Sequence, residues 1–347
     1  MATFIKILTK KNETRWKALV RKHGFDTTSK SFRTKRDAED WARRIEDEMV
    51  RGVYIQRATA EKTTLKAALN RYIEEISPLK SAKTHRGEKS KAIILKNYLG
   101  QRSLAGITSD VVGDFRDKRL NEGKSKNTVR LELALLSHLF TTAIQEWRLG
   151  LVYNPVNNIR KPSVKDSERD RILTPDEEKR LLKASDEYSN PMLGWIVRIA
   201  LNTGMRLSEI TYLGCKNLNL KNRTVVIYQT KNGETRTVPL NKEATRVFKL
   251  ALENPLRPKD CELMFFGNPG KDEERRPYVF NKAWGEILEK AKIKDFTFHD
   301  LRHCAVTKLV KLNLTDQEVA SISGHKSMQM LKRYTHLRAE DLVSKLG

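Results

Sequence analysis

The amino-acid sequence predicts a multidomain, mainly α protein. A small β-sheet-plus-helix N-terminal module is expected first, then a helical-bundle domain and then a mixed α+β domain. Short β-rich segments open the chain, and apolar residues then recur every three or four positions over about a hundred residues. A hairpin signal later interrupts a further set of helical segments. The 347 residues suffice for several domains, each with its own core.

Residues 1–56 are predicted to form a small module of three strands and one helix. Short runs that mix apolar and basic residues mark the strands, at Phe4–Leu8, Arg15–Arg21 and Ser31–Phe32. Thr34 is a suitable N-cap for the helix that follows. Basic side chains on such a sheet can enter a DNA groove, which predicts a DNA-binding module. A small sheet domain that binds a protein partner is the alternative.

Residues 57–160 are predicted to be all-helical and to form a four-helix bundle with Lys and Arg on its outer face. Apolar residues recur at spacings of three and four in four segments: Thr64–Ile76, Lys89–Leu99, Ser109–Leu120 and Ser125–Leu149. Glycines are expected to mark the helix ends: Gly87, Gly100, Gly123 and Gly150. The polar, charged stretch 161–173 is predicted to be a linker to the next domain.

Residues 174–347 are predicted to form the mixed α+β domain. Thr174 and Glu177 make a capping box with proline at the first helical position, which indicates a helix start. Two strands, Thr224–Gln229 and Thr235–Val238, are expected to pair through a turn between them. The other helices are predicted at Pro191–Leu201, Leu207–Leu213, Asn241–Leu252, Phe280–Ala291, Asp300–Leu312 and Thr315–Ser321.

The formal net charge of the chain is +24, and it is unevenly distributed. Residues 1–165 contain 35 Lys and Arg against 18 Asp and Glu, whereas residues 166–347 contain 32 against 25. This excess predicts binding to a polyanion, with a merely solvated surface as the alternative. No apolar run reaches membrane-spanning length, so no membrane association is expected. Three scattered cysteines favour a reduced cytosolic compartment and argue against structural zinc.

Basic residues near predicted turns are candidates for binding phosphate. Gly204 permits a turn between two apolar helices, which would put Arg206 near the free N–H groups of the second helix. Glu209 lies on the same helical face and can hold Arg206 in place, with an ordinary intrahelical pair as the alternative. Lys231 lies at the predicted hairpin tip and can protonate a departing alkoxide if the hairpin leans over a cleft. A solvated lysine is the alternative.

The C-terminal region combines histidines, an arginine and a tyrosine. His299 and His303 are four residues apart on a predicted helix, a spacing that metal pairs use. Arg302 lies beside them and would repel a cation, whereas a phosphate site uses it directly, so no metal is expected. Tyr334 has cationic neighbours that favour its phenolate as a nucleophile, with ordinary packing as the alternative. His325 precedes this tyrosine on a short helix-like stretch.

Together these stretches resemble the tyrosine recombinase family, whose members are also called phage-type integrases. The sequences TGMRLSE, HDLRH and SGHKS and the hairpin lysine occur in the order of the family motifs. Residues 57–160 look like the family's core-binding domain, and residues 174–347 look like its catalytic domain. The resemblance implies a set of catalytic residues, with a supporting glutamate: Arg206, Lys231, His299, Arg302, His325 and Tyr334, supported by Glu209.

The resemblance implies a DNA-cleaving enzyme that needs no metal or other cofactor. Tyr334 would attack the scissile phosphate and form a 3′-phosphotyrosyl bond, while the two arginines stabilise the developing negative charge. Lys231 would protonate the leaving 5′-oxygen, His299 would assist proton transfer at the tyrosine, and His325 would hydrogen-bond the phosphate. The implied partners are double-stranded DNA, further copies in a homo-tetramer on two DNA sites, and accessory DNA-bending or directionality proteins. The implied location is the bacterial cytoplasm, at the nucleoid.

Two finer similarities point to different uses of this chemistry. Residues 127–137 and 326–345 look like the shufflon-type DNA invertases, whereas residues 1–56 look like the arm-binding module of phage and genomic-island integrases. The chain also ends at Gly347, without the long C-terminal extension of the invertases. We therefore predict integration and excision of a mobile element, with DNA inversion as the alternative. A type IB topoisomerase and a non-catalytic DNA-binding regulator are more distant alternatives.

Overall fold

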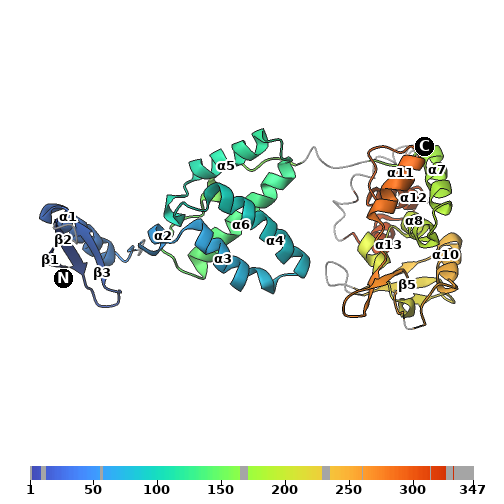
Figure 1. The fold of residues 1–347 in the computed structure, drawn as a ribbon, viewed down its shortest axis with the longest axis horizontal. Helices are drawn as coiled ribbons and strands as arrows, with labels where there is room; N and C mark the ends of the chain where they lie inside the picture. The colour runs from blue at the N-terminus through green and yellow to red at the C-terminus, as the bar shows by residue number, and fades with distance from the viewer. Residues whose placement is uncertain are drawn as a thin grey trace. The chain divides into compact units, whose positions relative to one another are not determined.

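The computed structural model describes residues 2–8, 13–54, 58–164, 171–228, 235–259, 261–312, 314–325 and 331. The chain divides into two compact units, Met1–Ser167 and Glu168–Gly347, each of which is described by itself (Figure 1). Two predicted site residues, Lys231 and Tyr334, lie outside the described residues. The domain boundaries drawn from the sequence are finer than this division and stay a prediction.

The first unit opens with the predicted three strands and one helix. The strands β1 (Ala2–Leu8), β2 (Thr14–Val20) and β3 (Thr28–Phe32) form an antiparallel sheet in the order β1-β2-β3. The helix α1 (Lys35–Val50) packs on β2 and buries a face of small and apolar side chains. Thr34 caps it as predicted, because its Oγ1 accepts a hydrogen bond from the N–H of Asp37 at 3.1 Å.

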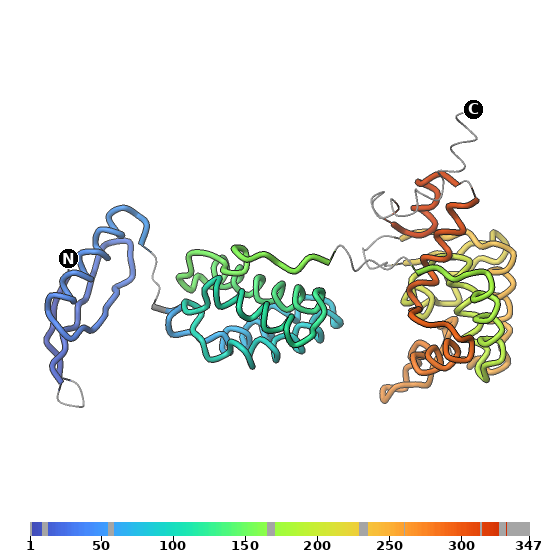
Figure 2. Tube along the Cα trace, turned by 90° about the horizontal axis from the view of Figure 1, so that it is seen from above, coloured from blue at the N-terminus to red at the C-terminus, as the bar shows by residue number. Residues whose placement is uncertain are grey.

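A helical region follows, as predicted. Its helices are α2 (Ala58–Lys62), α3 (Leu65–Glu75), α4 (Ala82–Leu99), α5 (Ser109–Asn121) and α6 (Lys126–Gln145). Figure 2 draws this region as a group of coils coloured blue-cyan to green, and α4 packs on both α3 and α6. The core between them is built from fully buried leucines, including Leu69, Leu95 and Leu136.

Three predicted boundaries in this region are wrong. The helix α4 begins well before Lys89, because the Oγ of Ser81 accepts a hydrogen bond from the N–H of Thr84 at 3.2 Å and caps an earlier start. Gly87 therefore lies inside α4 rather than at a helix end. The helix α6 stops short of the predicted Leu149, whose N–H instead bonds to the carbonyl of Ala143 at 3.0 Å in a closing turn.

The second unit has the predicted mixed α+β composition. Its helices are α7 (Pro175–Asp186), α8 (Pro191–Thr203), α9 (Leu207–Thr211), α10 (Lys242–Leu252), α11 (Asn281–Lys290), α12 (Asp300–Lys311) and α13 (Asp316–Ser323). Its strands are β4 (Leu218–Asn219), β5 (Thr224–Ile227) and β6 (Arg236–Pro239) in one sheet, and β7 (Phe266–Pro269) and β8 (Arg275–Pro277) in another. The central helix α8 packs on α7, α10 and α12, so it is apolar nearly all round.

The capping box at Thr174 and Glu177 is present as predicted. The sequence did not predict β4, β7 or β8, which are short and lack an alternating apolar pattern. The helix α9 ends at Thr211, earlier than the predicted Leu213. Among the described residues, no helix combines the length and the apolar character needed to span a bilayer.

Candidate active site

The turn between α8 and α9 places Arg206 as the sequence predicted. The helix α8 ends at Gly204, whose φ of 64° is a left-handed conformation that glycine adopts without strain. The N–H of Gly204 bonds to the carbonyl of Ala200 at 3.1 Å and closes the helix. Arg206 is then the N-cap residue of α9, and Glu209 lies one turn further on. Arg206 therefore stands at a helix N-terminus, where an anion is also favoured.

Glu209 is a buried carboxylate held by two arginines. Its Oε1 accepts hydrogen bonds from Nη1 of Arg206 at 2.8 Å and Nη1 of Arg236 at 2.9 Å. Its Oε2 accepts from the backbone N–H of Arg206 at 2.8 Å and from Nη2 of Arg236 at 2.7 Å. The Glu209 side chain is only 5% exposed. The predicted contact between Glu209 and Arg206 is thus present, and Arg236 is a second partner that the sequence did not predict.

The Glu209 carboxylate keeps its charge despite its burial. Burial is the largest influence and raises the pKa, but the hydrogen bonds and charges of Arg236, together with the N–H and guanidinium of Arg206, lower it by more. The net effect holds the pKa of Glu209 at about 2. Glu209, Arg206 and Arg236 are called the arginine cluster below. At neutral pH this cluster contains one negative and two positive charges.

Each of the two predicted site arginines, Arg206 and Arg302, donates a hydrogen bond to a backbone carbonyl that is distant in the sequence. Nη2 of Arg206 donates to the carbonyl oxygen of Gly324 at 3.2 Å. Nη1 of Arg302, on the buried face of α12, donates to the carbonyl oxygen of Gly204 at 2.6 Å. Gly324 ends α13 in a left-handed conformation with a φ of 71°, which places the next residue, His325, beside Arg302.

The two hydrogen bonds described at the His325 ring fit a single tautomer. Nη2 of Arg302 lies 3.2 Å from Nε2 of His325, and this nitrogen must accept, because a guanidinium has only donors. The Oγ of Ser323 lies 2.7 Å from Nδ1 of the same ring and donates its own proton to the carbonyl of Val319 at 2.6 Å. Nδ1 therefore carries the proton, an assignment made from the hydrogen-bond network. The ring is held at both nitrogens.

The structure thus brings together Arg206, Glu209, Arg302 and His325, four of the residues that the family resemblance implies. His299 lies at the N-cap position of α12, one turn before Arg302, and its ring centroid is 5.3 Å from that of His303. The rings are nearly perpendicular, at 89°. Among the described residues, no group of three or more metal-ligating side chains lies together.

Sequence reasoning assigned no role to Arg236, Ser323 or Gly324, although the last two lie within the quoted SGHKS stretch. A signal for Arg236 did exist. It lies two positions before Val238 in a predicted strand, so both side chains point to the same face of the sheet, and that of Val238 is fully buried. A charge on a buried face requires a counter-ion, and Glu209 is that counter-ion.

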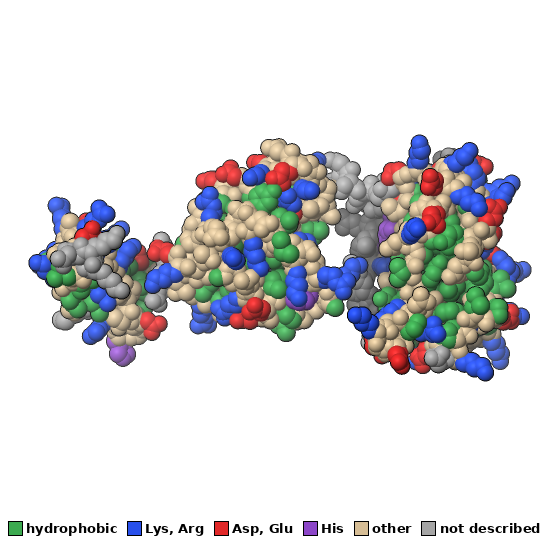
Figure 3. All heavy atoms as spheres, viewed as in Figure 1, with side chains coloured by type: hydrophobic (Ala, Val, Ile, Leu, Met, Phe, Trp, Pro, Cys, Tyr) green, Lys and Arg blue, Asp and Glu red, His purple; other side chains and the backbone are tan. Residues whose placement is uncertain are grey.

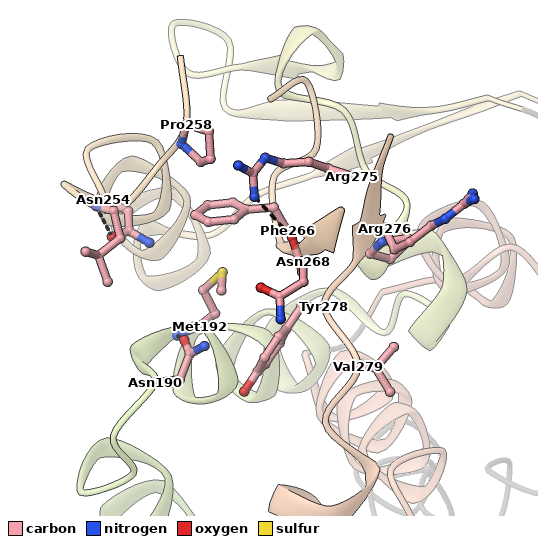
Figure 4. A pocket seen from close by; sticks show the side chains of 13 residues that line it. Asn190, Met192, Asn254, Pro258, Phe266, Asn268, Arg275, Arg276, Tyr278 and Val279 are labelled. Carbon is pink, nitrogen blue, oxygen red and sulfur yellow. Dashed lines mark hydrogen bonds between the residues drawn. The ribbon is translucent and has the colours of Figure 1, made fainter. Parts of the chain in front are cut away.

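A separate hollow of about 650 Å³ lies elsewhere on the second unit, between the start of α8, the chain after α10, and β7 and β8 (Figure 4). Its lining combines amide, aromatic and basic side chains, such as Asn190, Phe266, Arg275 and Tyr278. None of the predicted site residues lines it. The arginine cluster and this hollow therefore lie at different places in the second unit.

Comparison with known proteins identifies relatives of both units. Residues 171–341 match the model of the phage integrase family. A shufflon-specific DNA recombinase of Escherichia coli is 40% identical over 294 residues, which are 82% of this chain and 72% of that protein. A putative integrase/recombinase of Haemophilus influenzae is 29% identical over an alignment of 365 residues, which covers 100% of this chain and 91% of that protein.

A solved structure shares the fold. A crystal structure of a lambda integrase tetramer bound to a Holliday junction matches with a TM-score of 0.63 and 21% identity, over 91% of this chain and 91% of that chain. This likeness confirms the predicted fold class, a mainly helical chain with a small N-terminal sheet and a mixed α+β domain.

Proposed function

The chain belongs to the phage integrase family of tyrosine recombinases, enzymes that cleave and rejoin DNA, and we propose that it integrates and excises a mobile element. One observation carries the proposed site. Arg206 and Arg302, from helices far apart in the sequence, are tied to Gly324 and Gly204 and meet beside His325. Two fixed guanidinium groups at one place form a phosphate receiver.

The proposed reaction is a transesterification at a DNA phosphate. The Oη of Tyr334 attacks the phosphorus, an Oη–P bond forms, and the bond from phosphorus to the 5′-oxygen breaks. Arg206 and Arg302 bind the non-bridging oxygens and stabilise the charge that builds on them in the transition state. His325 hydrogen-bonds the same phosphate.

Two further residues would move the protons. Lys231 gives a proton to the leaving 5′-oxygen, and His299 takes one from the attacking Tyr334. The energy of the broken bond is kept in the phosphotyrosine, and a 5′-hydroxyl of the partner strand reverses the reaction. Positive charge at the phosphate comes from the guanidinium groups, so the proposed steps need no bound cofactor.

Double-stranded DNA is the proposed substrate. The net charge of +24 favours a polyanion, and Figure 3 shows Lys and Arg side chains on the surface of each unit by itself. The lambda integrase of the structural match binds a Holliday junction as a tetramer. We propose the same assembly for this chain, on two DNA sites.

Integration, rather than inversion, is favoured by the N-terminal module. The Haemophilus influenzae relative, a putative integrase/recombinase, aligns along the full chain, the module included. Inversion remains the second candidate, because the shufflon-specific recombinase has the higher identity. The two functions use the same chemistry and differ in the arrangement of their DNA sites.

Covalent trapping on nicked DNA tests the chemistry. The wild type is expected to form a protein–DNA adduct that survives a denaturing gel, and Tyr334→Phe is expected to abolish it while DNA binding is retained, because the nucleophile is lost. Tyr212→Phe is the matched control, since Tyr212 is 69% exposed on the same unit and should not affect the adduct. An adduct formed by Tyr334→Phe would refute the assignment.

The same adduct locates the sites on the DNA around the gene. Two cleavage sites in direct orientation at the ends of an element support integration. Several inverted sites around a coding cassette would instead show that the chain is an invertase.

A further inference from the structure

Arg236 belongs to the arginine cluster, through its contact with Glu209, but is not one of the predicted site residues. It lies on β6, and its side chain is only 12% exposed. Its two terminal nitrogens bond to the two oxygens of Glu209, at 2.9 and 2.7 Å, in the fork geometry that makes arginine–carboxylate pairs strong. Within the described residues, its buried Nε has no hydrogen-bond partner. The hydrogen bonds described for the Arg236 guanidinium therefore all go to Glu209.

Arg236 also lies against the turn that carries His325. A Cβ built on Gly324 would come within 2.7 Å of the Arg236 guanidinium, so the guanidinium packs directly on the glycine backbone. The carbonyl of the same glycine accepts the hydrogen bond from Arg206. Arg236 thus contacts both the carboxylate and the turn that hold Arg206.

The balance of charge indicates what Arg236 does. Glu209 has one negative charge and two guanidinium partners, and the Arg236 pair is bidentate whereas the side chain of Arg206 supplies one bond. With Arg236 present, the carboxylate is already neutralised and Arg206 keeps its charge for another anion. Without Arg236, Arg206 becomes the sole counter-ion of a buried carboxylate, which strengthens their attraction in a region of low dielectric constant.

We propose that Arg236 is a positioning residue of the recombination reaction: it neutralises Glu209 and braces Gly324, so that Arg206 remains available to the scissile phosphate. This inference rests on the proposed function, in which Arg206 binds that phosphate. A purely structural ion pair is the opposing interpretation, and it predicts a loss of stability without any dependence on the charge of the substrate.

The test compares Arg236→Met on two nicked substrates. One has an ordinary scissile phosphate, and the other has a neutral methylphosphonate at that position. On the ordinary phosphate, the rate of adduct formation should fall on the order of a hundred-fold with DNA affinity unchanged, because transition-state charge is no longer stabilised. On the neutral substrate this deficit should shrink to within about ten-fold, because less charge develops there. An equal deficit on both substrates would overturn the proposal.

A second variant tests the role of Glu209. Adding Glu209→Gln to Arg236→Met removes the negative charge that would otherwise hold Arg206, so the double variant should cleave faster than Arg236→Met alone. If the double variant is no faster, the charge argument is wrong. Arg198→Met is the matched control, because Arg198 is 16% exposed and forms an equally bidentate pair with Asp186 away from the cluster. It should cleave both substrates at the wild-type rate.

Two measurements keep the result interpretable. If Arg236→Met is unfolded at the assay temperature, Arg236→Lys is used, since it keeps the positive charge beside Glu209. It should retain most of the wild-type rate on the ordinary phosphate, and a deficit as large as that of Arg206→Met would refute the proposal. The rate deficit of Arg206→Met should itself be smaller on the neutral substrate than on the ordinary phosphate. If it is not, or if the wild type forms no adduct that depends on Tyr334, the proposed function has failed rather than the role of Arg236.

Discussion

At the scale of single residues, the charge of Glu209 makes stability depend on pH. Its pKa is about 2 in the folded protein, against an ordinary value of 4.5, so the folded state favours the ionised carboxylate. This contribution is fully present above pH 4.5 and is lost as the pH falls through about 2. A shift of this size is worth up to about 3 kcal/mol in the free energy of unfolding.

We therefore expect the stability difference between the wild type and Glu209→Gln to decrease on acidification. Urea unfolding at a series of pH values from about 6 to about 2 measures it, and carboxylates common to both proteins cancel in the comparison. A difference that stays constant across this range would mean that Glu209 is not stabilised as a carboxylate in the fold.

From the residues alone, the sequence predicted one contact within the site, between Arg206 and Glu209, and this contact is local. Arg206 and Glu209 follow from a glycine turn and from helical spacing, both of which lie within a few residues. Arg236 was missed because its partner, Glu209, is 27 positions away, and only the folded sheet brings them together. The tautomer of His325 was equally inaccessible, because it depends on Arg302 and Ser323 acting at once.

At the scale of elements, Gly324 links α13 to the site. An alanine there would adopt a φ of 71°, and its Cβ would meet the Arg236 guanidinium at 2.7 Å. We expect Gly324→Ala to lower the free energy of unfolding by about 1–2 kcal/mol, because a left-handed conformation is unfavourable for residues with a Cβ. Adduct formation should fall by more than DNA binding, because Arg236 and the carbonyl that holds Arg206 are both displaced.

The matched control for Gly324→Ala is Gly285→Ala. Gly285 lies inside α11, and a Cβ added there meets no atom within 4 Å. This change should stabilise the protein by roughly 0.5–1 kcal/mol, as alanine does in a helix interior. Urea midpoints measure both effects, and equal midpoints for the two variants would contradict this account of Gly324.

The predicted elements were those with a long periodic pattern or a side-chain cap. The helices α1 and α7 began where their threonine caps indicated. The strands β7 and β8 were missed because they pair with each other in an irregular register and carry no alternating apolar residues. The start of α4 was missed because its first turns are polar, and Ser81 rather than an apolar stripe begins it.

At the scale of the whole molecule, fold and charge are divided between the two units. The largest core cluster lies entirely in the second unit, and the first unit has separate clusters of its own. The fold class was predictable because periodicity and turn signals change along the chain at these places. The positive excess is concentrated in residues 1–165, whereas the arginine cluster belongs to the second unit.

This division predicts how salt affects DNA binding. Each phosphate neutralised by a basic side chain releases counter-ions, so the logarithm of affinity falls with the logarithm of salt concentration by about 0.9 per contact. The fragment 168–347 has few of the excess charges, so its affinity should be lower and its salt dependence shallower than those of the full chain. The fragment 1–167 should keep most of the full-chain slope.

Fluorescence anisotropy at several salt concentrations measures the slopes, after circular dichroism has shown that each fragment is folded. Equal slopes for the two fragments would show that the second unit contributes as many phosphate contacts as the first, and would contradict the prediction that the excess charge of residues 1–165 dominates the salt dependence.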